Sequence, residues 1–82
     1  MPVEIYTTPF CPYCTRAKRL LAKKKVAFED IDVSDWSARA ALARKAGGLT
    51  TVPQIWVGET HVGGCDELYA LEAEGKLDAL LG

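Results

Sequence analysis

The sequence predicts a single α/β domain, residues 1–82, with a four-stranded mixed sheet flanked by three or four helices. Three observations predict this fold. Strand-like and helix-like segments alternate, an early β-α-β unit is followed by a helix, and a later β-β-α unit contains a tight hairpin. A crossover helix makes the first two strands parallel, and the hairpin makes the sheet mixed. Eighty-two residues leave no room for a second domain.

The first half of the chain has the pattern of a β-α-β unit. Residues 3–6 contain β-branched and aromatic side chains typical of a strand. Pro9 and Pro12 interrupt this strand, and an apolar stripe at helical spacing follows, formed by Ala17, Leu20 and Leu21. Residues 26–33 are again strand-like, although the alternation slips near Asp30. We therefore expect a strand, a helix from Pro12 and a second strand over 26–33.

A second helix follows. Ser34 and Asp35 are candidate caps for a helix that continues to Lys45, and Gly47-Gly48 is a plausible end because glycine accepts the left-handed conformation. Residues 54–57 and 60–62 predict a hairpin around Gly58-Glu59. One or two closing helical segments are marked by Leu68, Leu71 and Leu77, and we expect packing roles for Phe28, Trp36, Trp56 and Tyr69.

Composition excludes several classes of function. The formal net charge is -1, so the chain has no global field to attract nucleic acid or an acidic membrane. Lys23-Lys24-Lys25 is interpreted as a solvated helix end. No apolar run approaches the length of a membrane span, and the first residues do not resemble a secretory signal. The three cysteines do not suit a disulfide scaffold, which favours a cytoplasmic, reducing location.

Cys11-Pro12-Tyr13-Cys14 is the segment that carries chemistry. Such a pair can be a redox dithiol, part of a zinc site or two unrelated structural cysteines. A zinc site would need Cys11, Cys14, Cys65 and His61 together, and their spacing resembles no known zinc motif. The pair instead follows a strand and opens a helix in a β-α-β unit, which favours a redox dithiol.

The two cysteines are expected to have different roles. Cys11 lies where free backbone N–H groups and the positive end of the helix dipole favour thiolate over thiol. Cys14 lies one turn further into the helix on the same face, so it is less exposed and suited to resolving a mixed disulfide.

The chain resembles the glutaredoxins, specifically the short bacterial dithiol class, over essentially its whole length. Three motifs carry the resemblance: Cys11-Pro12-Tyr13-Cys14, Thr51-Val52-Pro53 and Gly63-Gly64-Cys65-Asp66. The resemblance implies a thioredoxin-like fold and a monomeric, glutathione-dependent enzyme without a tightly bound cofactor. Its expected substrates are disulfide-containing and glutathionylated proteins.

The resemblance also implies a set of glutathione contacts. Pro53 is expected to be cis, with the Val52 backbone paired to the cysteinyl part of glutathione. Gly64, Cys65 and Asp66 are expected to hold the γ-glutamyl end. The other implied contacts are Tyr13, Arg39 and Thr51.

Two departures from the family pattern remove positive charge. Thr8 and Leu49 occupy positions that are often basic, which leaves Arg39 and Lys45 as nearby cations. Two rival functions stay open: a redoxin reduced by thioredoxin reductase, and a carrier of an iron–sulfur cluster. For Cys65 we favour a semi-buried structural role over that of an accessory thiol.

Overall fold

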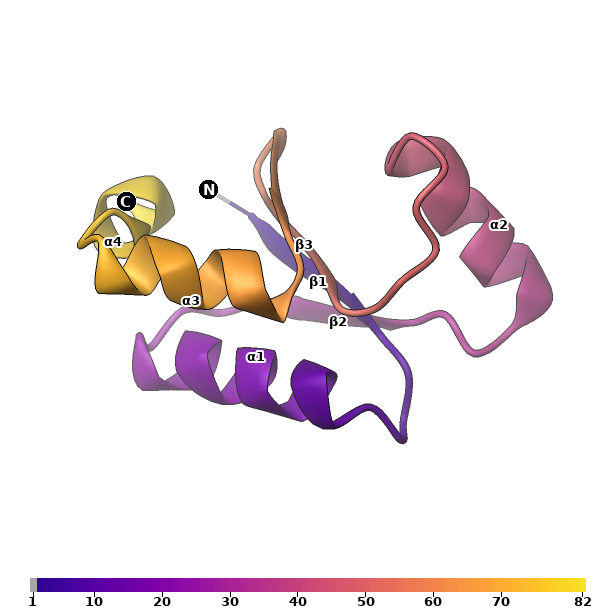
Figure 1. Cartoon of the computed structure of the whole chain (residues 1–82), viewed down its shortest axis with the longest axis horizontal. Helices are drawn as coiled ribbons and strands as arrows, with labels where there is room; N and C mark the ends of the chain where they lie inside the picture. Colours follow the sequence, from indigo (N-terminus) through magenta and orange to yellow (C-terminus); the bar gives the residue numbers. More distant parts are fainter. Residues whose placement is uncertain (1) are drawn as a thin grey trace.

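The computed structural model describes residues 2–82 and contains one four-stranded sheet in the order β2-β1-β3-β4 (Figure 1). β1 is parallel to β2 and antiparallel to β3, and β3 is antiparallel to β4. The predicted mixed sheet is thus confirmed. The elements in chain order are β1 Val3–Thr7, α1 Pro12–Lys23, β2 Glu29–Asp32, α2 Trp36–Lys45, β3 Gln54–Val57, β4 Thr60–Gly63, α3 Cys65–Ala73 and α4 Leu77–Leu81.

The sheet has a core on each face. On one face, Val3 and Ile5 of β1 and Ile55 and Val57 of β3 pack with residues of α1, α3 and α4, including the fully buried Leu21. The other face is covered by α2, whose Leu42 packs with Trp56 in a smaller cluster. Alternation along the strands produces this division, because successive side chains point to opposite faces. Figure 1 shows α2 apart from the other helices.

The turn signals of the sequence correspond to real boundaries. Asp35 is the N-cap of α2 and its carboxylate accepts a hydrogen bond from Ala38 N at 3.3 Å. The helix ends at Lys45, shortly before Gly47, whose φ of 68° is left-handed. Gly58 has a φ of 60° in the β3–β4 turn. None of the helices within residues 2–82 has both the length and the apolar character needed to cross a membrane.

Two expectations are wrong. The second strand begins at Glu29 rather than Val26, because Val26 N still bonds to Leu21 O at the end of α1, at 3.3 Å. Val26 is partly buried against the core on the sheet face that α1, α3 and α4 cover, and it lies outside β2. Trp36 is not a packing residue: it is the first residue of α2 and is 83% exposed. It lies six residues before Leu42, about 120° around the helix axis from the face that Leu42 buries.

Candidate functional site

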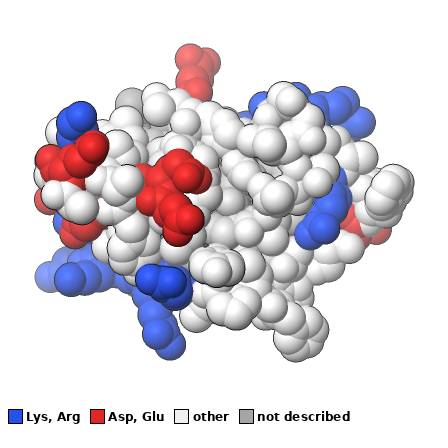
Figure 2. Space-filling model, in the orientation of Figure 1, with Lys and Arg blue, Asp and Glu red and all other residues white. Residues whose placement is uncertain are grey.

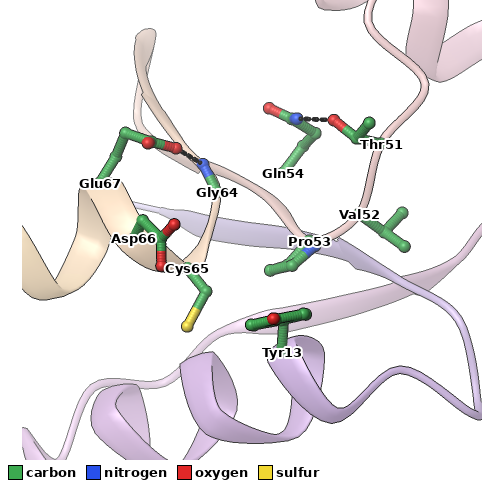
Figure 3. Close-up of a pocket in the computed structure, with 9 residues that line it drawn as sticks. All are labelled: Tyr13, Thr51, Val52, Pro53, Gln54, Gly64, Cys65, Asp66 and Glu67. Carbon is green, nitrogen blue, oxygen red and sulfur yellow. Dashed lines mark hydrogen bonds between the residues drawn. The ribbon is translucent and has the colours of Figure 1, made fainter.

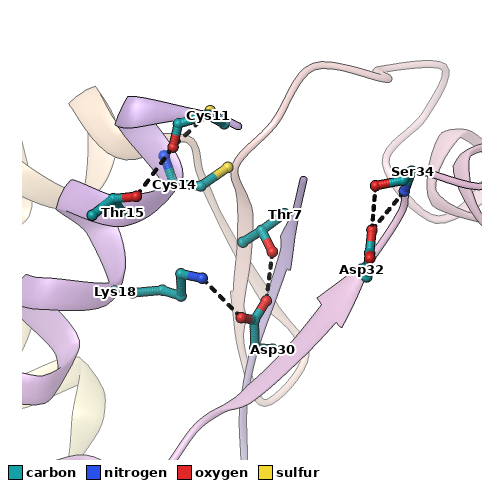
Figure 4. Close-up of polar contacts among 8 residues, drawn as sticks. All are labelled: Thr7, Cys11, Cys14, Thr15, Lys18, Asp30, Asp32 and Ser34. Carbon is teal, nitrogen blue, oxygen red and sulfur yellow. Dashed lines mark hydrogen bonds and ion pairs between the residues drawn. The ribbon is translucent and has the colours of Figure 1, made fainter. Parts of the chain in front are cut away.

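Cys11 is the N-cap of α1. Its backbone is extended, with φ -109° and ψ 110°, and Pro12 occupies the first helical position. The Cys11 Sγ accepts a hydrogen bond from Cys14 N at 3.3 Å (Figure 4). The sulfur therefore takes the place of a capping oxygen at the positive end of the helix dipole. This position stabilises negative charge on sulfur.

Cys14 has a contrasting environment one turn further into α1. Its side chain is 1% exposed, and all three cysteines of the chain are free thiols. Burial, with a further contribution from hydrogen bonding to Cys11, raises the pKa of Cys14 from 9.0 to about 12. Cys14 is therefore protonated at neutral pH and protected from external reagents. The contrast in exposure expected from the sequence is confirmed.

The segment before β3 lies against Cys11. The Cys11 Sγ lies 3.8 Å from Val52 O and donates a weak hydrogen bond to it. The Val52–Pro53 peptide bond is cis, as the resemblance implied. A segment 41 residues away in sequence thus borders the N-terminus of α1.

A cavity of about 210 Å³ opens beside these residues (Figure 3). Three parts of the chain form it: the start of α1, the segment before β3 and the start of α3. All but one of the implied contacts line it, together with two residues that the sequence did not indicate. The lining residues are Tyr13, Thr51, Val52, Pro53, Gln54, Gly64, Cys65, Asp66 and Glu67.

The start of α3 needs a glycine at position 63 and is capped by the side chain of Glu67. Gly63 has a φ of 113°, and a Cβ there would lie 2.9 Å from Glu67 Cγ. The Glu67 carboxylate accepts a hydrogen bond from Gly64 N at 2.7 Å. Cys65 is buried, and burial raises the pKa of its thiol. Asp66 is exposed and lines the cavity.

The predicted cations lie outside the lining. Arg39 is half-buried on α2, and its Nε is buried without a hydrogen-bond partner in the described part of the chain, residues 2–82. Lys45 is paired with Glu4 at 2.6 Å, and its Nζ lies 4.7 Å from the centre of the Trp56 ring. Lys45 is therefore committed to the α2 face of the sheet. Leu49 is 49% exposed.

Sequence reasoning missed three polar residues at or near this site. Glu67 could have been found from its spacing of three from Gly64, which is half of a capping box. Gln54 is 4% exposed, and its Nε2 donates to Thr51 Oγ1 at 3.0 Å. The Gln54 Oε1 is bonded to His61 Nε2 at 2.7 Å. No local motif indicates that second contact, because it depends on the register of β3 and β4.

The described residues do not form the cluster of ligands that a zinc site would need. Among residues 2–82, no group of three or more His, Cys, Asp or Glu side chains is placed to hold a metal ion. His61 stacks on Trp56, with ring centroids 4.3 Å apart and an interplanar angle of 11°.

Charged side chains are unevenly placed around the site. Figure 2 shows acidic side chains gathered over the beginning of α3 and basic ones over α2, with uncharged surface between them. Asp66 and Glu67 are the acidic residues in the first turn of α3.

Comparison with known proteins gives consistent matches. The glutaredoxin family model matches residues 3–62. A glutaredoxin of Pseudomonas aeruginosa is 67% identical over 81 residues, covering 98% of this chain and 95% of the relative. The solution structure of Brucella melitensis glutaredoxin is 56% identical with a TM-score of 0.86, covering 99% of this chain and 88% of that one.

A crystal structure of a buckwheat glutaredoxin–glutathione complex is 30% identical with a TM-score of 0.87, covering 98% of this chain and 76% of that one. The chain belongs to the glutaredoxin family of glutathione-linked thiol oxidoreductases and has their thioredoxin-like fold.

Proposed function

We propose that this chain uses a Cys11/Cys14 dithiol and glutathione to reduce protein disulfides and protein–glutathione mixed disulfides. One observation carries the proposal. The Cys11 sulfur is the N-cap of α1 and accepts the Cys14 N–H at 3.3 Å, while the Cys14 side chain is 1% exposed. One thiol is thus placed to attack an external sulfur, and the other is accessible only to a disulfide formed at Cys11.

Reduction of a protein disulfide needs both thiols. The Cys11 thiolate attacks one substrate sulfur, the substrate S–S bond breaks, and the second substrate sulfur leaves as a thiolate. The pKa of Cys14 is raised to about 12, so Cys14 must lose its proton before it reacts. The leaving thiolate is a base that can accept that proton. Cys14 then attacks Cys11, releases the substrate and forms Cys11–Cys14, which two glutathiones reduce as they become glutathione disulfide.

Reduction of a glutathionylated protein needs only Cys11. The Cys11 thiolate attacks the glutathionyl sulfur, and the protein leaves as a thiolate that takes up a proton. A second glutathione thiolate then attacks the Cys11–glutathione disulfide, giving glutathione disulfide and regenerating the Cys11 thiolate. Cys14 takes no part in this route.

The cavity and its charges support glutathione as the co-substrate. The Val52 carbonyl oxygen lies 3.8 Å from the Cys11 sulfur, so the Val52 backbone is available to the cysteinyl part of glutathione. Asp66 offers a carboxylate to the γ-glutamyl ammonium, and the first N–H groups of α3 offer donors to its carboxylate. Arg39, whose Nε is unpartnered within residues 2–82, is our candidate for the glycyl carboxylate. Tyr13 and Thr51 contribute to the walls.

Exposed aromatic side chains support proteins as substrates. Phe10 is 96% exposed and Tyr13 is 55% exposed, on either side of Cys11 in the sequence. Apolar surface next to a reactive sulfur suits transient contact with a polypeptide. The proposal includes action as a monomer in the cytoplasm, a reducing compartment consistent with free thiols.

The test is a pair of assays with glutathione as the sole reductant. One assay follows reduction of a protein disulfide, and the other follows reduction of a glutathionylated peptide. We expect Cys14→Ser to lose the first activity and keep the second. Cys11→Ser, the matched control at the other sulfur, should lose both.

Two results would contradict the proposal. Equal loss of both activities in Cys14→Ser would disprove the division of roles between the cysteines. Absence of glutathione-supported turnover in the unmodified protein, with turnover restored by thioredoxin reductase, would favour the rival redoxin function.

A further inference from the structure

A polar chain runs from the edge of the sheet into the cavity. Gln54 and Trp56 are two residues apart on β3, so their side chains lie on the same face of the sheet. His61 pairs with Trp56 across the β3–β4 ladder, which brings its ring beside both residues. The His61 Nε2 lies 2.7 Å from Gln54 Oε1, and Gln54 Nε2 lies 3.0 Å from Thr51 Oγ1.

The direction of these hydrogen bonds follows from the orientation of the Gln54 amide, whose oxygen faces His61 and whose nitrogen faces Thr51. A carbonyl oxygen cannot donate, so with this amide orientation the hydrogen bond requires the tautomer that carries a proton on His61 Nε2. The amide NH₂ of Gln54 then faces Thr51 and donates to its oxygen (Figure 3). As the Thr51 oxygen is the acceptor in this contact, its own O–H proton stays available for another partner. Within residues 2–82, no acceptor lies within hydrogen-bond distance of that proton.

Packing holds the donor in place. The His61 ring is stacked on Trp56 at 4.3 Å, and Trp56 is 4% exposed. Tyr6 packs edge-on against Trp56 at 5.3 Å, and Lys45 Nζ lies 4.7 Å from its ring centre. The plane of the imidazole is therefore set by a buried partner, although His61 itself is at the edge of the sheet.

We propose that His61, acting through Gln54, is a positioning residue that directs the Thr51 hydroxyl to donate a hydrogen bond to an anionic oxygen of glutathione. Without His61, the Gln54 amide is free to turn its oxygen toward Thr51. The hydroxyl would then donate to Gln54 instead of to the ligand. This inference rests on the proposed function, since it assigns a partner within the same cavity.

The experiment measures kcat and KM for a glutathionylated peptide with glutathione as reductant. His61→Phe keeps a flat ring on Trp56 and removes the N–H donor, whereas Thr51→Val keeps the shape and removes the hydroxyl. We expect each variant to raise KM about three- to tenfold with kcat unchanged, the size of one net hydrogen bond. The double variant should be no worse than either single variant, because both remove the same hydrogen bond.

Conservative replacements and a neighbouring hydroxyl provide the controls. His61→Gln retains an N–H donor and Thr51→Ser retains the hydroxyl, so each should raise KM less than the variant at the same position that removes the group. Thr60→Val removes an exposed hydroxyl on the same strand as His61 and should leave KM unchanged. Thermal unfolding of each variant separates a local effect from a loss of fold.

Three outcomes would overturn the inference. They are an unchanged KM in His61→Phe, multiplied KM effects in the double variant, and a lower kcat at constant KM. Each of these requires turnover in the unmodified protein. A complete lack of glutathione-supported turnover would instead contradict the proposed function itself, so the two failures are distinguishable.

Discussion

The N-termini of α1 and α3 both border the cavity, but they are capped in different ways. At α1 the cap is the Cys11 sulfur, the atom that we propose reacts. At α3 the Glu67 carboxylate caps Gly64 N from inside the helix, 2.7 Å away. The first N–H groups of α3 have no partner within the helix itself. In the function that we propose, one helix end therefore supplies the reactive atom, and the other supplies backbone donors that its own cap does not use.

The largest effect on activity should come from a substitution that keeps the cap of α1 and removes the Cys11 sulfur. Serine is one of the best N-cap residues, so Cys11→Ser should keep the unfolding free energy within about 1 kcal/mol of the unmodified value. Activity should fall more than about a thousandfold, as expected when a nucleophile is removed. Denaturant unfolding and the glutathione-coupled assay measure the two quantities. Substantial residual activity would show that Cys11 is not the attacking sulfur.

The two buried cysteines provide a second comparison, because Cys14 lies near the start of α1 and Cys65 at the start of α3. A pKa of about 12 in place of 9.0 lowers the thiolate fraction of Cys14 about a thousandfold near pH 8. Burial also raises the pKa of Cys65. Iodoacetamide at pH 8 should therefore modify one cysteine per chain, Cys11, and modify all three in denaturant. Mass spectrometry of proteolytic peptides gives the site, and rapid labelling of Cys65 in the native protein would contradict the expectation.

The same pKa shift predicts loss of stability at alkaline pH. The folded state keeps the Cys14 proton to a higher pH than the unfolded chain does. Its stabilising contribution is complete below about pH 9 and is lost as pH rises toward 12. Cys14→Ser should flatten the stability profile in that range. An unchanged alkaline slope would mean that Cys14 does not contribute.

A third effect concerns the backbone before α3. Gly63→Ala places a Cβ 2.9 Å from Glu67 Cγ at a φ of 113°, so we expect a loss of about 2–3 kcal/mol in unfolding free energy. Gly75→Ala is the matched control, since Gly75 also has a positive φ of 72° but no atom within 4 Å of the added Cβ. It should lose only about 1 kcal/mol. Equal losses of unfolding free energy in the two variants, measured by urea unfolding, would show that contact with Glu67 does not contribute to the destabilisation.

The smallest effect should come from the carboxylate cap. Glu67→Ala leaves Gly64 N without its partner and should cost about 1 kcal/mol of unfolding free energy. Glu67→Gln retains an acceptor and should lose less. Glu59→Ala, at an exposed position in the β3–β4 turn, is the neutral control. A loss in Glu67→Ala no greater than in Glu59→Ala would contradict a capping role.

The sequence predicts most of this fold because its signals are local. Asp35 caps α2 and Gly58 turns the hairpin through groups within a few residues of each other. Trp36 and the beginning of β2 were predicted wrongly for a different reason. Aromatic and β-branched character indicates what a residue can do, whereas exposure and strand pairing depend on the partner that tertiary packing provides.

The site likewise combines residues that local sequence signals indicate with residues that only the tertiary structure brings together. Cys11 and Cys14 could be predicted as a pair from their spacing together with their place after a strand and at the start of a helix. The cavity also lies against the residues implied by the resemblance, with the exception of Arg39. Gln54 and His61 could not be connected from the sequence, because their contact depends on the register between β3 and β4 and on the shift in that register near Trp56.

The two tryptophans give this protein two built-in optical reporters. Trp36 is 83% exposed and Trp56 is 4% exposed, so their emission should differ in wavelength and in accessibility to aqueous quenchers. Replacing Trp36 by phenylalanine at the surface leaves Trp56, which is stacked on His61, as the single tryptophan, and excitation at wavelengths where tyrosine does not absorb isolates its emission. Its quantum yield would then follow changes in the His61–Gln54–Thr51 chain during glutathione binding, without a label attached to any cysteine.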